Sequence, residues 1–576
     1  MTSRLDALIV ALAAATALGA APREEAVRDI DKVVPLAPGR SLRVSNEHGD
    51  VAIRAGAGPE VTLHAKVWVS AATRSETERY AAGVRVEVQE DAAGVLLRTV
   101  YPDPGEEPGD LSFSVDYDIT VPKAAPVSVR SRFGDVTATG LETLVEIVNS
   151  HGRIGLSDTR GEGRLQNEFG IVEAERTTGA LAITNTNGAV SVTGVGGALI
   201  VNNRFADVTV RQARSAVSLT VSNANVAVSE AAGPVKITDA FSLVLVSTVA
   251  GDLTVDNRNG RVEARGIGGK LTVSSVQGEV TFADVGGAGV TSSEGRVSGT
   301  LARGPVQVKN AGGAVSLRDV RGDVRNGHGP VSVRDVRGAV VVGNSLGDVE
   351  VAGVQGRARV ENSRGAILLR NVSGAAAVRG RHGRIESRHL GGSLEVRSSD
   401  GDVSVADVAG SVFVGTSFGL VQAEGVGPLT VDSANAAVRA TSVRGDAAIR
   451  TSSGAVVLSA VEGSVDVTNE SGAIEVSGIA PKGPGGCRRT ALATSFAPIQ
   501  ITLPEVSGFD LNARTSLGKI RSGLPLAAGG ATDSFVGPIG GGGCEVTLAN
   551  RSGDIVILSG AVPGRTSTAG PPRPAP

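Results

Sequence analysis

A nine-residue repeat governs most of this 576-residue chain. Segments such as GALAITNTN at 179, GAVSVTGVG at 188 and GDLTVDNRN at 251 begin with glycine in one phase, and roughly 40 such modules follow one another. Val, Ile or Leu usually fills the third position and often the fifth. This period-two alternation predicts a short strand with one buried face, and the glycine predicts a corner before it.

Two modules form one unit of 18 residues, because consecutive modules differ at their corners. One class of corner is apolar, as at Val195 and Val336, and the other is polar, most often asparagine. Stacking such units places residues 18 apart on neighbouring parallel strands, about 4.8 Å from each other. The sequence therefore predicts an all-β fold, a parallel β-solenoid of flattened two-sheet coils with β-rich caps at both ends. A β-sandwich of hairpins would require longer strands and two-residue turns.

The polar corners predict a structural ladder of asparagines along the stack. A buried amide is tolerated only where its hydrogen bonds are satisfied, and we expect each amide to bond to the next one. The ladder comprises Asn149, Asn167, Asn185, Asn203, Asn257, Asn344 and Asn362.

The sequence predicts five segments: the repeat region and two segments on each side of it. Residues 1–21 have a weakly basic start, an apolar run and small residues suited to cleavage, which indicates a signal peptide; a membrane anchor is the alternative, but the run is short for one. Residues 22–122 predict an N-terminal β-rich cap with one short helix, and 123–480 the solenoid repeats. Residues 481–562 predict a C-terminal cap, and 563–576 a disordered tail.

The only cysteines, Cys487 and Cys544, both fall in the predicted C-terminal cap. In an exported chain an isolated pair is most simply one disulfide bond. Two free buried thiols are the alternative. A zinc site would require more ligands than these cysteines and the sparse histidines supply.

The segment GNSLG at 343–347 has the G-x-S-x-G spacing that presents a nucleophilic serine in many hydrolases. That motif needs a strand-to-helix turn, whereas the pattern here continues as strands. The spacing also recurs as GTSFG at 415–419, at an equivalent corner of the repeat. We therefore interpret Ser345 as a corner residue, and the sequence predicts no catalytic residue.

No pattern in the sequence predicts a metal ion or another cofactor. The six histidines lack the spacing of metal ligands, and we expect them at solvated corners. The aspartates of the G-D-V segments recur too irregularly for calcium-binding nonapeptide repeats, although one or two corners could hold calcium. Four phenylalanines recur every 36 residues and predict an apolar stripe used in packing: Phe133, Phe169, Phe205 and Phe241.

Several segments together resemble a bacterial family of exported β-strand-repeat proteins labelled "putative adhesin". They are SLRVSNEHGDVAI near the start, DYDITVPKAAPVSVRSRFGDVTATGL at the first repeats, the G-x-V-x-V modules, and LNARTSLGKI with SGDIVI near the end. The resemblance covers most of the chain after the signal peptide. It implies a solenoid and a location in the cell envelope, and it supplies no catalytic residues.

These observations lead to a functional hypothesis. The net charge of −3 argues against binding to nucleic acid or another polyanion and against a membrane surface, and after signal cleavage we expect no membrane insertion. We expect a non-enzymatic scaffold exported to the periplasm, cell surface or medium, where it acts as an adhesin or binds an unknown envelope or extracellular partner, a protein or a glycan. The alternatives are a polysaccharide-processing β-helix enzyme and a self-assembling envelope filament.

Overall fold

A computed structural model describes residues 23–103, 111–483, 485–504, 508–525 and 532–560. The chain divides into two compact units, residues 1–218 and 219–576, and each is described by itself. The predicted signal peptide (1–21) and disordered tail (563–576) lie outside the described residues.

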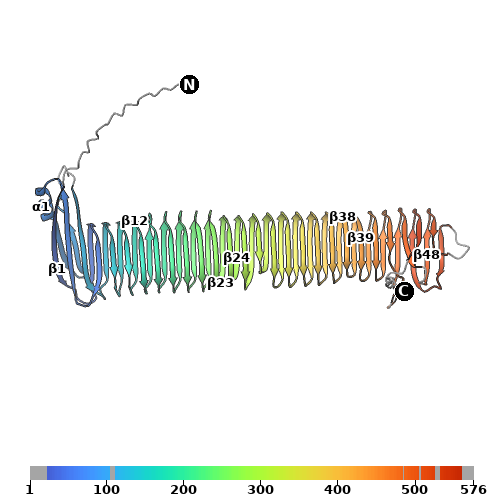
Figure 1. The fold of residues 1–576 in the computed structure, drawn as a ribbon, viewed down its shortest axis with the longest axis horizontal. Helices are drawn as coiled ribbons and strands as arrows, with labels where there is room; N and C mark the ends of the chain where they lie inside the picture. Colours follow the sequence, from blue (N-terminus) through green and yellow to red (C-terminus); the bar gives the residue numbers. More distant parts are fainter. Residues whose placement is uncertain (1–22, 104–110, 484, 505–507, 526–531, 561–576) are drawn as a thin grey trace, which may run out of the picture. The chain divides into compact units, whose positions relative to one another are not determined.

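Unit 1 is built almost entirely of strands, drawn from blue to cyan in Figure 1. The one helix among the described residues of this unit, α1 (Arg74–Gly83), begins at the N-cap Thr73 and lies where the sequence predicts a short helix. The strands are β1 (Glu24–Pro35), β2 (Ser41–His48), β3 (Val51–Gly56), β4 (Glu60–Ala71), β5 (Arg85–Asp91), β6 (Gly94–Val100), β7 (Ser112–Pro122), β8 (Val127–Phe133), β9 (Val136–Thr139), β10 (Val145–His151), β11 (Ile154–Ser157), β12 (Gly163–Phe169), β13 (Val172–Thr177), β14 (Leu181–Asn185), β15 (Val190–Val195), β16 (Leu199–Arg204) and β17 (Val208–Ala213); β18 (Val217–Ser222) spans the boundary between the units.

The predicted two-sheet solenoid with 18-residue coils is confirmed. Strand β10 pairs in parallel with β8 and β12, so that Ile147 lies one coil from both Val129 and Leu165. Strand β11 pairs in the same way with β9 and β13. We call the sheet whose strands carry the asparagine ladder the amide sheet (β8, β10, β12, β14 and β16 in unit 1) and the other the opposite sheet.

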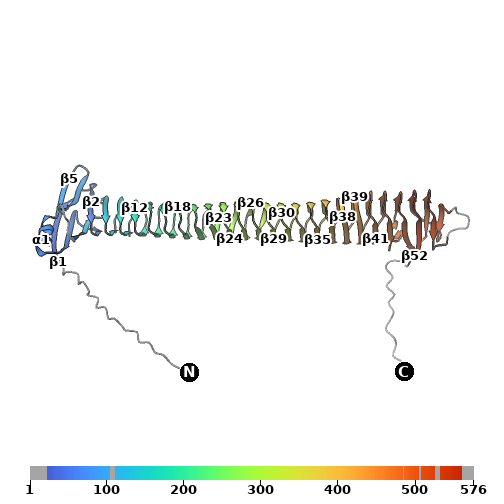
Figure 2. The same cartoon turned by 90° about the horizontal axis from the view of Figure 1, so that it is seen from above.

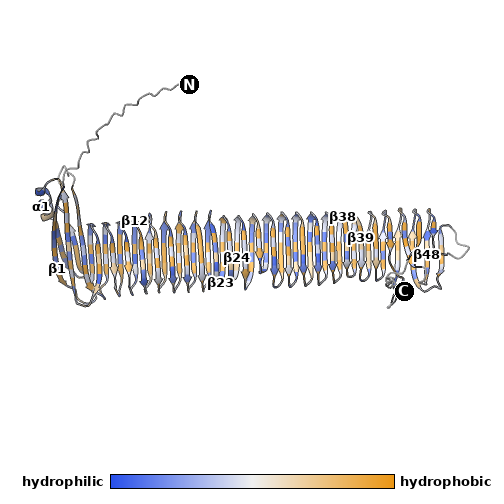
Figure 3. Cartoon of the chain, viewed as in Figure 1, coloured by the Kyte–Doolittle hydropathy of each residue, from blue (hydrophilic) through white to orange (hydrophobic). Residues whose placement is uncertain are grey.

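Alternation along each strand supplies the core between the two sheets. In β15, Val190 and Val192 are buried while Ser191 and Thr193 are partly exposed. Figure 3 shows the same alternation of apolar and polar residues along successive strands. Burying one such valine is worth about 1.5–3 kcal/mol, but a single coil has no partner against which to bury both its faces. Stability therefore comes from the stack.

The solenoid begins earlier than the sequence prediction placed it. Strands β2 and β3 stack in register beneath β8 and β9, with Leu42 beside Val127 and Val51 beside Val136. The predicted boundary at residue 123, with 22–122 entirely a cap, is therefore wrong. The phase was hidden because residues 57–126 separate two coils that are adjacent in space.

Antiparallel strands close the N-terminal end of unit 1. Beyond β2 and β3 lies a further coil formed by β6 and β7. Strand β5 then pairs antiparallel with β6, and β4 pairs antiparallel with both β7 and β1. This mixed sheet, with α1 against β1 and β4, covers the exposed edge of the parallel stack.

The asparagine ladder forms, but its hydrogen bonds differ from those predicted. Asn149 and Asn167 lie beside each other in register and are 1% exposed. Asn167 Nδ2 donates to the carbonyl of Gly152 at 2.9 Å, and Asn185 Nδ2 donates to Gly170 O at 3.1 Å and Gly188 O at 2.6 Å.

Each amide thus binds backbone carbonyls at the corners and not the next amide. An asparagine donates to a carbonyl two or three residues ahead, to the matching glycine carbonyl of the preceding coil, or to both. The Asn167 Oδ1 atom has no hydrogen-bond partner among the described residues. The predicted bonding of one amide to the next is therefore wrong, because corner carbonyls lie within reach of every buried Nδ2.

The corner glycines are required by both conformation and space. Gly152 has φ +125°, and a Cβ atom there would lie 2.1 Å from the carbonyl oxygen of Gly134 in the preceding coil. A side chain at this position would therefore clash with backbone. Gly134 has the same φ and would clash in the same way with Gly49, which extends the column into the coil of β2 and β3.

The G-D-V aspartates link consecutive coils. Asp135 Oδ1 accepts a hydrogen bond from the backbone N–H of Arg153, 18 residues ahead, at 2.8 Å. In unit 2, Asp348 Oδ1 accepts from the N–H of Ala366 at the same distance. The carboxylates satisfy corner amides, so the recurring motif needs no cation to account for it.

Unit 2 continues the same architecture, drawn from green to red in Figure 1. Seen from above in Figure 2, its strands again follow one another as regular rungs. Its strands are β19 (Val226–Ala231), β20 (Val235–Ala240), β21 (Leu243–Val249), β22 (Leu253–Arg258), β23 (Arg261–Gln277), β24 (Val280–Glu294), β25 (Val297–Ala302), β26 (Pro305–Gly312), β27 (Val315–Arg318), β28 (Arg321–His328), β29 (Val331–Val336), β30 (Val340–Leu346), β31 (Val349–Val354), β32 (Ala358–Arg364), β33 (Ile367–Val372), β34 (Ala376–His382), β35 (Ile385–Leu390), β36 (Leu394–Asp400), β37 (Val403–Val408), β38 (Val412–Val426), β39 (Leu429–Val443), β40 (Ala447–Thr451), β41 (Val456–Val461), β42 (Val465–Asn469), β43 (Ile474–Ser477), β44 (Lys482–Gly483), β45 (Gly486–Cys487), β46 (Thr490–Thr494), β47 (Ile499–Pro504), β48 (Phe509–Thr515), β49 (Ile520–Ser522), β50 (Ser534–Ile539), β51 (Cys544–Asn550) and β52 (Ile555–Gly560).

The final coils of unit 2 stack out of chain order. Strands β46 and β47 follow β42 and β43, as expected from their sequence. The next coil is formed by β51 and β52, and β48 with β49 lies beyond it. Strand β50 pairs antiparallel with β48 and covers the last parallel strand of the amide sheet. The last strands of the described chain are thus held between two other coils.

A disulfide bond joins Cys487 and Cys544, as the sequence predicts. Cys487 is exposed in the short hairpin of β44 and β45, whereas Cys544 is buried at the start of β51. The bond ties the inserted coil to the hairpin that precedes β46.

Removing one ladder amide should destabilise the stack measurably. Asn185→Ala leaves the carbonyls of Gly170 and Gly188 without their donor, and we expect a loss of about 1–3 kcal/mol in the free energy of unfolding of unit 1. Thr184→Ala, an exposed position on the same strand, should change it by less than about 0.5 kcal/mol. Chemical denaturation of both variants tests this, and equal stability of the two would contradict the assigned role.

The aspartate in the asparagine column of unit 2 should make stability depend on pH. Asp239 is 4% exposed beside Asn257; its Oδ1 accepts from Ser242 Oγ, and its Oδ2 has no partner among the described residues. Burial raises the pKa of this carboxyl. The folded chain therefore binds the proton more tightly than the unfolded chain, so stability is lost as pH rises from the unfolded pKa toward the folded one.

Asp239→Asn should remove this penalty and supply an amide donor. We expect a gain of about 1 kcal/mol near pH 7 that shrinks toward pH 3. Thermal melts of both proteins across this pH range measure the difference. A variant that is less stable than the parent at pH 7 would show that the buried carboxylate is favourable.

The disulfide should stabilise the C-terminal coils in particular. The cysteines are separated by 57 positions in the sequence, for which the chain-entropy model gives roughly 4 kcal/mol. We expect Cys487→Ala with Cys544→Ala to speed hydrogen exchange in β46 to β52 while leaving β28 to β34 unchanged. Unchanged exchange in β46 to β52 would contradict this.

Candidate binding surface

The outward face of the amide sheet in unit 2 contains a trough of about 620 Å³ near its polar corners. The outward positions of successive strands build it: Asp432 lies beside Arg450, and Arg450 beside Thr468. The surface is hollowed here because the small side chains of Ala493 and Ala549 occupy the same column in the next two coils. The lining residues are Asp432, Ser433, Arg450, Thr451, Ser452, Thr468, Asn469, Glu470, Ala493, Thr494, Ser495, Ser516, Ala549, Asn550 and Arg551.

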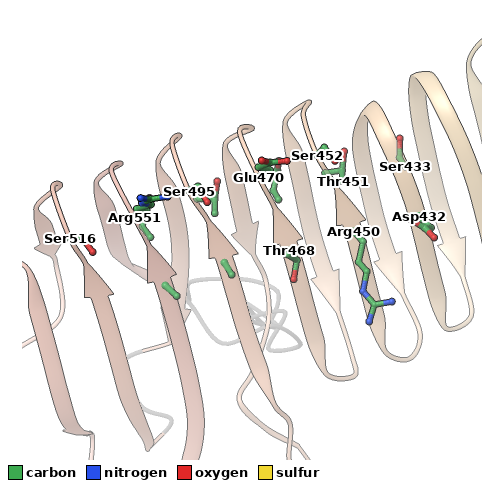
Figure 4. Close-up of a pocket in the computed structure, with 15 residues that line it drawn as sticks. Asp432, Ser433, Arg450, Thr451, Ser452, Thr468, Glu470, Ser495, Ser516 and Arg551 are labelled. Atoms are coloured by element: carbon green, nitrogen blue, oxygen red, sulfur yellow. The ribbon is translucent and has the colours of Figure 1, made fainter.

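The out-of-order stacking brings distant residues together in this trough. In Figure 4, Ser452, Glu470, Ser495, Arg551 and Ser516 follow one another near the tips of successive strands. Arg551 stands between Ser495 and Ser516 because β51 lies between β46 and β48. A trough in simple chain order would have placed Ser516 there.

The charged residues of the trough have no partners within the part of the chain that the structure describes. Asp432, Arg450, Glu470 and Arg551 form no ion pair and no side-chain hydrogen bond with other described residues. Two cations and two anions therefore offer their full hydrogen-bonding capacity to solvent or to a ligand.

Some of the hydroxyl groups in the trough also make no hydrogen bond with described residues. Thr451 and Thr494 donate to corner carbonyls and belong to the fold. The hydroxyls of Ser452, Thr468 and Ser495, by contrast, make no hydrogen bond within the described part of the chain. A surface of free hydroxyls and charges suits a polar ligand with many hydrogen-bonding groups.

Exposed apolar side chains stand at the corners next to the trough. Phe496 is 59% exposed and Leu517 is 81% exposed, each directly after a lining serine. An exposed aromatic ring beside polar groups is a combination that ligand sites use for orientation and contact area.

Ser345 lies at the exposed end of β30, as its place in the repeat predicts. It makes no hydrogen bond to a histidine or carboxylate among the described residues. Its neighbours in a shallow hollow are arginines and the ladder residues Asn344 and Asn362.

No group of three or more His, Cys, Asp or Glu side chains in the described ranges is arranged to hold a metal ion. Three of the G-D-V aspartates considered for calcium, Asp135, Asp348 and Asp402, accept hydrogen bonds from backbone amides.

One histidine, His48, is half-buried instead of lying at a solvated corner, whereas His151 is exposed at its corner as predicted. In unit 1, His48 stacks on Phe133 with ring centroids 5.1 Å apart, and His151 stacks between Phe133 at 4.9 Å and Phe169 at 4.8 Å. Burial lowers the pKa of His48. Two of the four phenylalanines of the predicted stripe, Phe133 and Phe169, therefore belong to an aromatic column with these histidines, whereas Phe205 and Phe241 are more exposed.

Tyr101 contacts His48, the residue at the N-terminal end of this column. Its hydroxyl donates to Asn46 Oδ1 at 2.9 Å, and its ring lies edge-on to His48. Burial raises the pKa of Tyr101 to about 12. These contacts hold the coil of β2 and β3 against its neighbours. The aromatic column therefore serves packing.

The comparisons with known proteins bear on the part of the chain that holds the trough. Residues 385–558 match a family model described as Toastrack DUF4097. This segment, which we call the Toastrack segment, is similar to that family. The trough, which runs from Asp432 to Arg551, lies entirely within the Toastrack segment.

Solved structures with detected similarity to the chain come from three bacteria. A putative cell adhesion protein of Clostridium sporogenes ATCC 15579 is 10% identical, with 37% of this chain and 100% of that one covered and a TM-score of 0.17. Putative adhesins of Bacteroides fragilis NCTC 9343 and Parabacteroides distasonis ATCC 8503 are 12% and 11% identical, each over 49% of this chain and 97% of theirs, with TM-scores of 0.20 and 0.18. Such values are too low to transfer a function. No curated protein matches the chain.

No helix in the described residues is long and apolar enough to cross a membrane.

The trough was not predictable from the sequence. Its outward residues alternate with the core valines, so Thr468 and Ser495 were visible as polar positions. Their assembly depends on the insertion of β51 between β46 and β48, and no repeat signal specifies that order.

Proposed function

We propose that this chain is an exported, non-enzymatic β-solenoid scaffold that binds a polar partner of the cell envelope through the trough of its Toastrack segment. The observation that carries the proposal is the set of four charged side chains without internal partners, beside free hydroxyls and the exposed ring of Phe496. Surface charges with no ion pair contribute nothing to holding the coils together, which makes them available for recognition.

A glycan is the partner class that best fits this surface. Sugars present many hydroxyls that exchange hydrogen bonds with serine, threonine and charged groups, and their apolar faces pack on aromatic rings. The signal-peptide pattern and the disulfide both support export. The antiparallel strands that cover the terminal coils speak against a head-to-tail filament.

A matched pair of double variants tests the proposal. Arg450→Ala with Glu470→Ala removes one cation and one anion from the trough, and Arg439→Ala with Glu475→Ala removes the same charges from the opposite sheet of the same coils. We expect the first variant to lose at least about tenfold in affinity for purified envelope polysaccharide in a surface-binding assay, and the second to bind like the parent.

The assay also separates the proposed partner classes. Binding that resists periodate oxidation of the polysaccharide and disappears after protease treatment would identify a protein partner. Equal binding by both double variants and the parent would refute the trough as the contact surface.

A further inference from the structure

The coils between residues 318 and 397 are far more basic than the chain as a whole. They contain 14 arginines against eight aspartates and glutamates, although the net charge of the chain is −3. Every basic side chain between Lys309 and Lys482 is arginine. Arginine presents a planar fork of N–H donors that matches carboxylate and sulfate groups, which lysine does not.

Several of these arginines surround one hollow on the outward face of the amide sheet. The hollow has a volume of about 670 Å³, and Gly343 leaves a gap in its floor where neighbouring coils carry long side chains. Arg325, Gly343, Glu361 and Arg379 occupy one outward column on consecutive strands β28, β30, β32 and β34. Three coil steps separate Arg325 from Arg379, a distance of roughly 14 Å.

The arginines of this hollow are only partly neutralised by described residues of the chain. Arg325 and Arg381 form no ion pair with any described residue. Arg359 and Arg379 share one carboxylate, Glu361, at 2.6 and 3.7 Å. Asp323 of the same face forms no ion pair with these arginines, whereas Glu395, in the adjoining hollow, pairs with Arg397 at 2.7 Å.

The opposite sheet of the neighbouring coils is arranged differently. There Arg318 pairs with Asp335 at 2.8 Å, and Arg334 pairs with Glu350 at 2.6 Å. Arg388 likewise pairs with Glu386 at 2.9 Å, and Arg370 is the one arginine on the described strands of this face from β27 to β37 that has no ion pair. The contrast indicates that the excess charge belongs specifically to the amide sheet.

A second hollow of about 860 Å³ continues the first toward the next coils. The two share Val341 and Arg359, so together they form one groove that crosses the strands from β28 to β38. In the second hollow Ala377 keeps the floor low, and Arg397 lies over the ring of Phe413, 5.4 Å from its centroid. We call the two hollows the arginine groove.

We propose that the arginine groove binds a linear anionic polysaccharide through its carboxylate or sulfate groups. A groove that crosses several coils fits an extended polymer, and cations at coil intervals can contact successive charged sugars. The low floor at Gly343 and Ala377 leaves room for the sugar rings. A lipid surface would instead require the arginines to project beyond their surroundings, whereas these flank a concavity.

This inference goes beyond the trough, because it concerns a different surface with a named ligand class. It also qualifies the sequence-based argument against polyanion binding. Net charge reports the whole chain, whereas recognition depends on the local field of one face.

The test uses the full chain after signal cleavage and fluorescently labelled heparin as the probe. Arg325→Gln with Arg381→Gln removes two unpaired arginines of the groove, and Arg370→Gln with Arg388→Gln removes the same charge from the opposite sheet. We expect heparin affinity to fall at least about tenfold in the first variant and by less than about twofold in the second. Affinity of the parent should weaken with added salt, and thermal melts should show that both variants remain folded.

Three results would overturn the proposal. They are no heparin binding by the parent, equal loss in both double variants, and tighter binding to phosphatidylglycerol vesicles than to heparin with the same dependence on Arg325 and Arg381. The trough variant Arg450→Ala with Glu470→Ala should bind heparin like the parent, so failure at the trough and failure at the arginine groove are told apart.

Discussion

Parallel stacking with an 18-residue step is the constraint on which the rest of this structure depends. Because each residue lies beside its equivalent in the next coil, every choice of side chain is repeated along a column. Apolar columns become a core, and a polar inward column must find hydrogen bonds within the same narrow space. The asparagines meet this requirement by binding corner carbonyls, and the corner glycines leave room for those carbonyls to come close.

The regular part of the fold was predictable because its signals are local and repeated. The period, the two sheets and the membership of the asparagine column all follow from the alternation of apolar and polar residues. The bonding within the column did not follow, because it depends on where the corner carbonyls point. The ends also escaped prediction: Leu42 and Val127 are neighbours in space, yet 85 residues of sequence separate them, and no local pattern specifies such a register.

The same constraint decides where binding surfaces arise. Side chains in the outward columns do not pack in the core, so their size and charge can vary. Small residues there form a hollow, and charged residues there can contact a ligand. The polar trough depends on Ala493 and Ala549, and the arginine groove depends on Gly343. Both lie on the amide sheet, and neither could be located from sequence alone, because concavity results from the side chains that adjacent coils lack.

The in-register stack can be tested most directly by spin labels on adjacent coils. Thr184 and Asn202 are exposed partners in neighbouring strands of the amide sheet, and Thr193 lies between them in sequence on the opposite sheet. Nitroxide labels at 184 and 202, in a chain whose two native cysteines are bonded, should show strong dipolar broadening at a separation of roughly 5 Å between their backbones. Labels at 184 and 193 should not. Broadening for 184 with 193 and none for 184 with 202 would contradict the 18-residue coil.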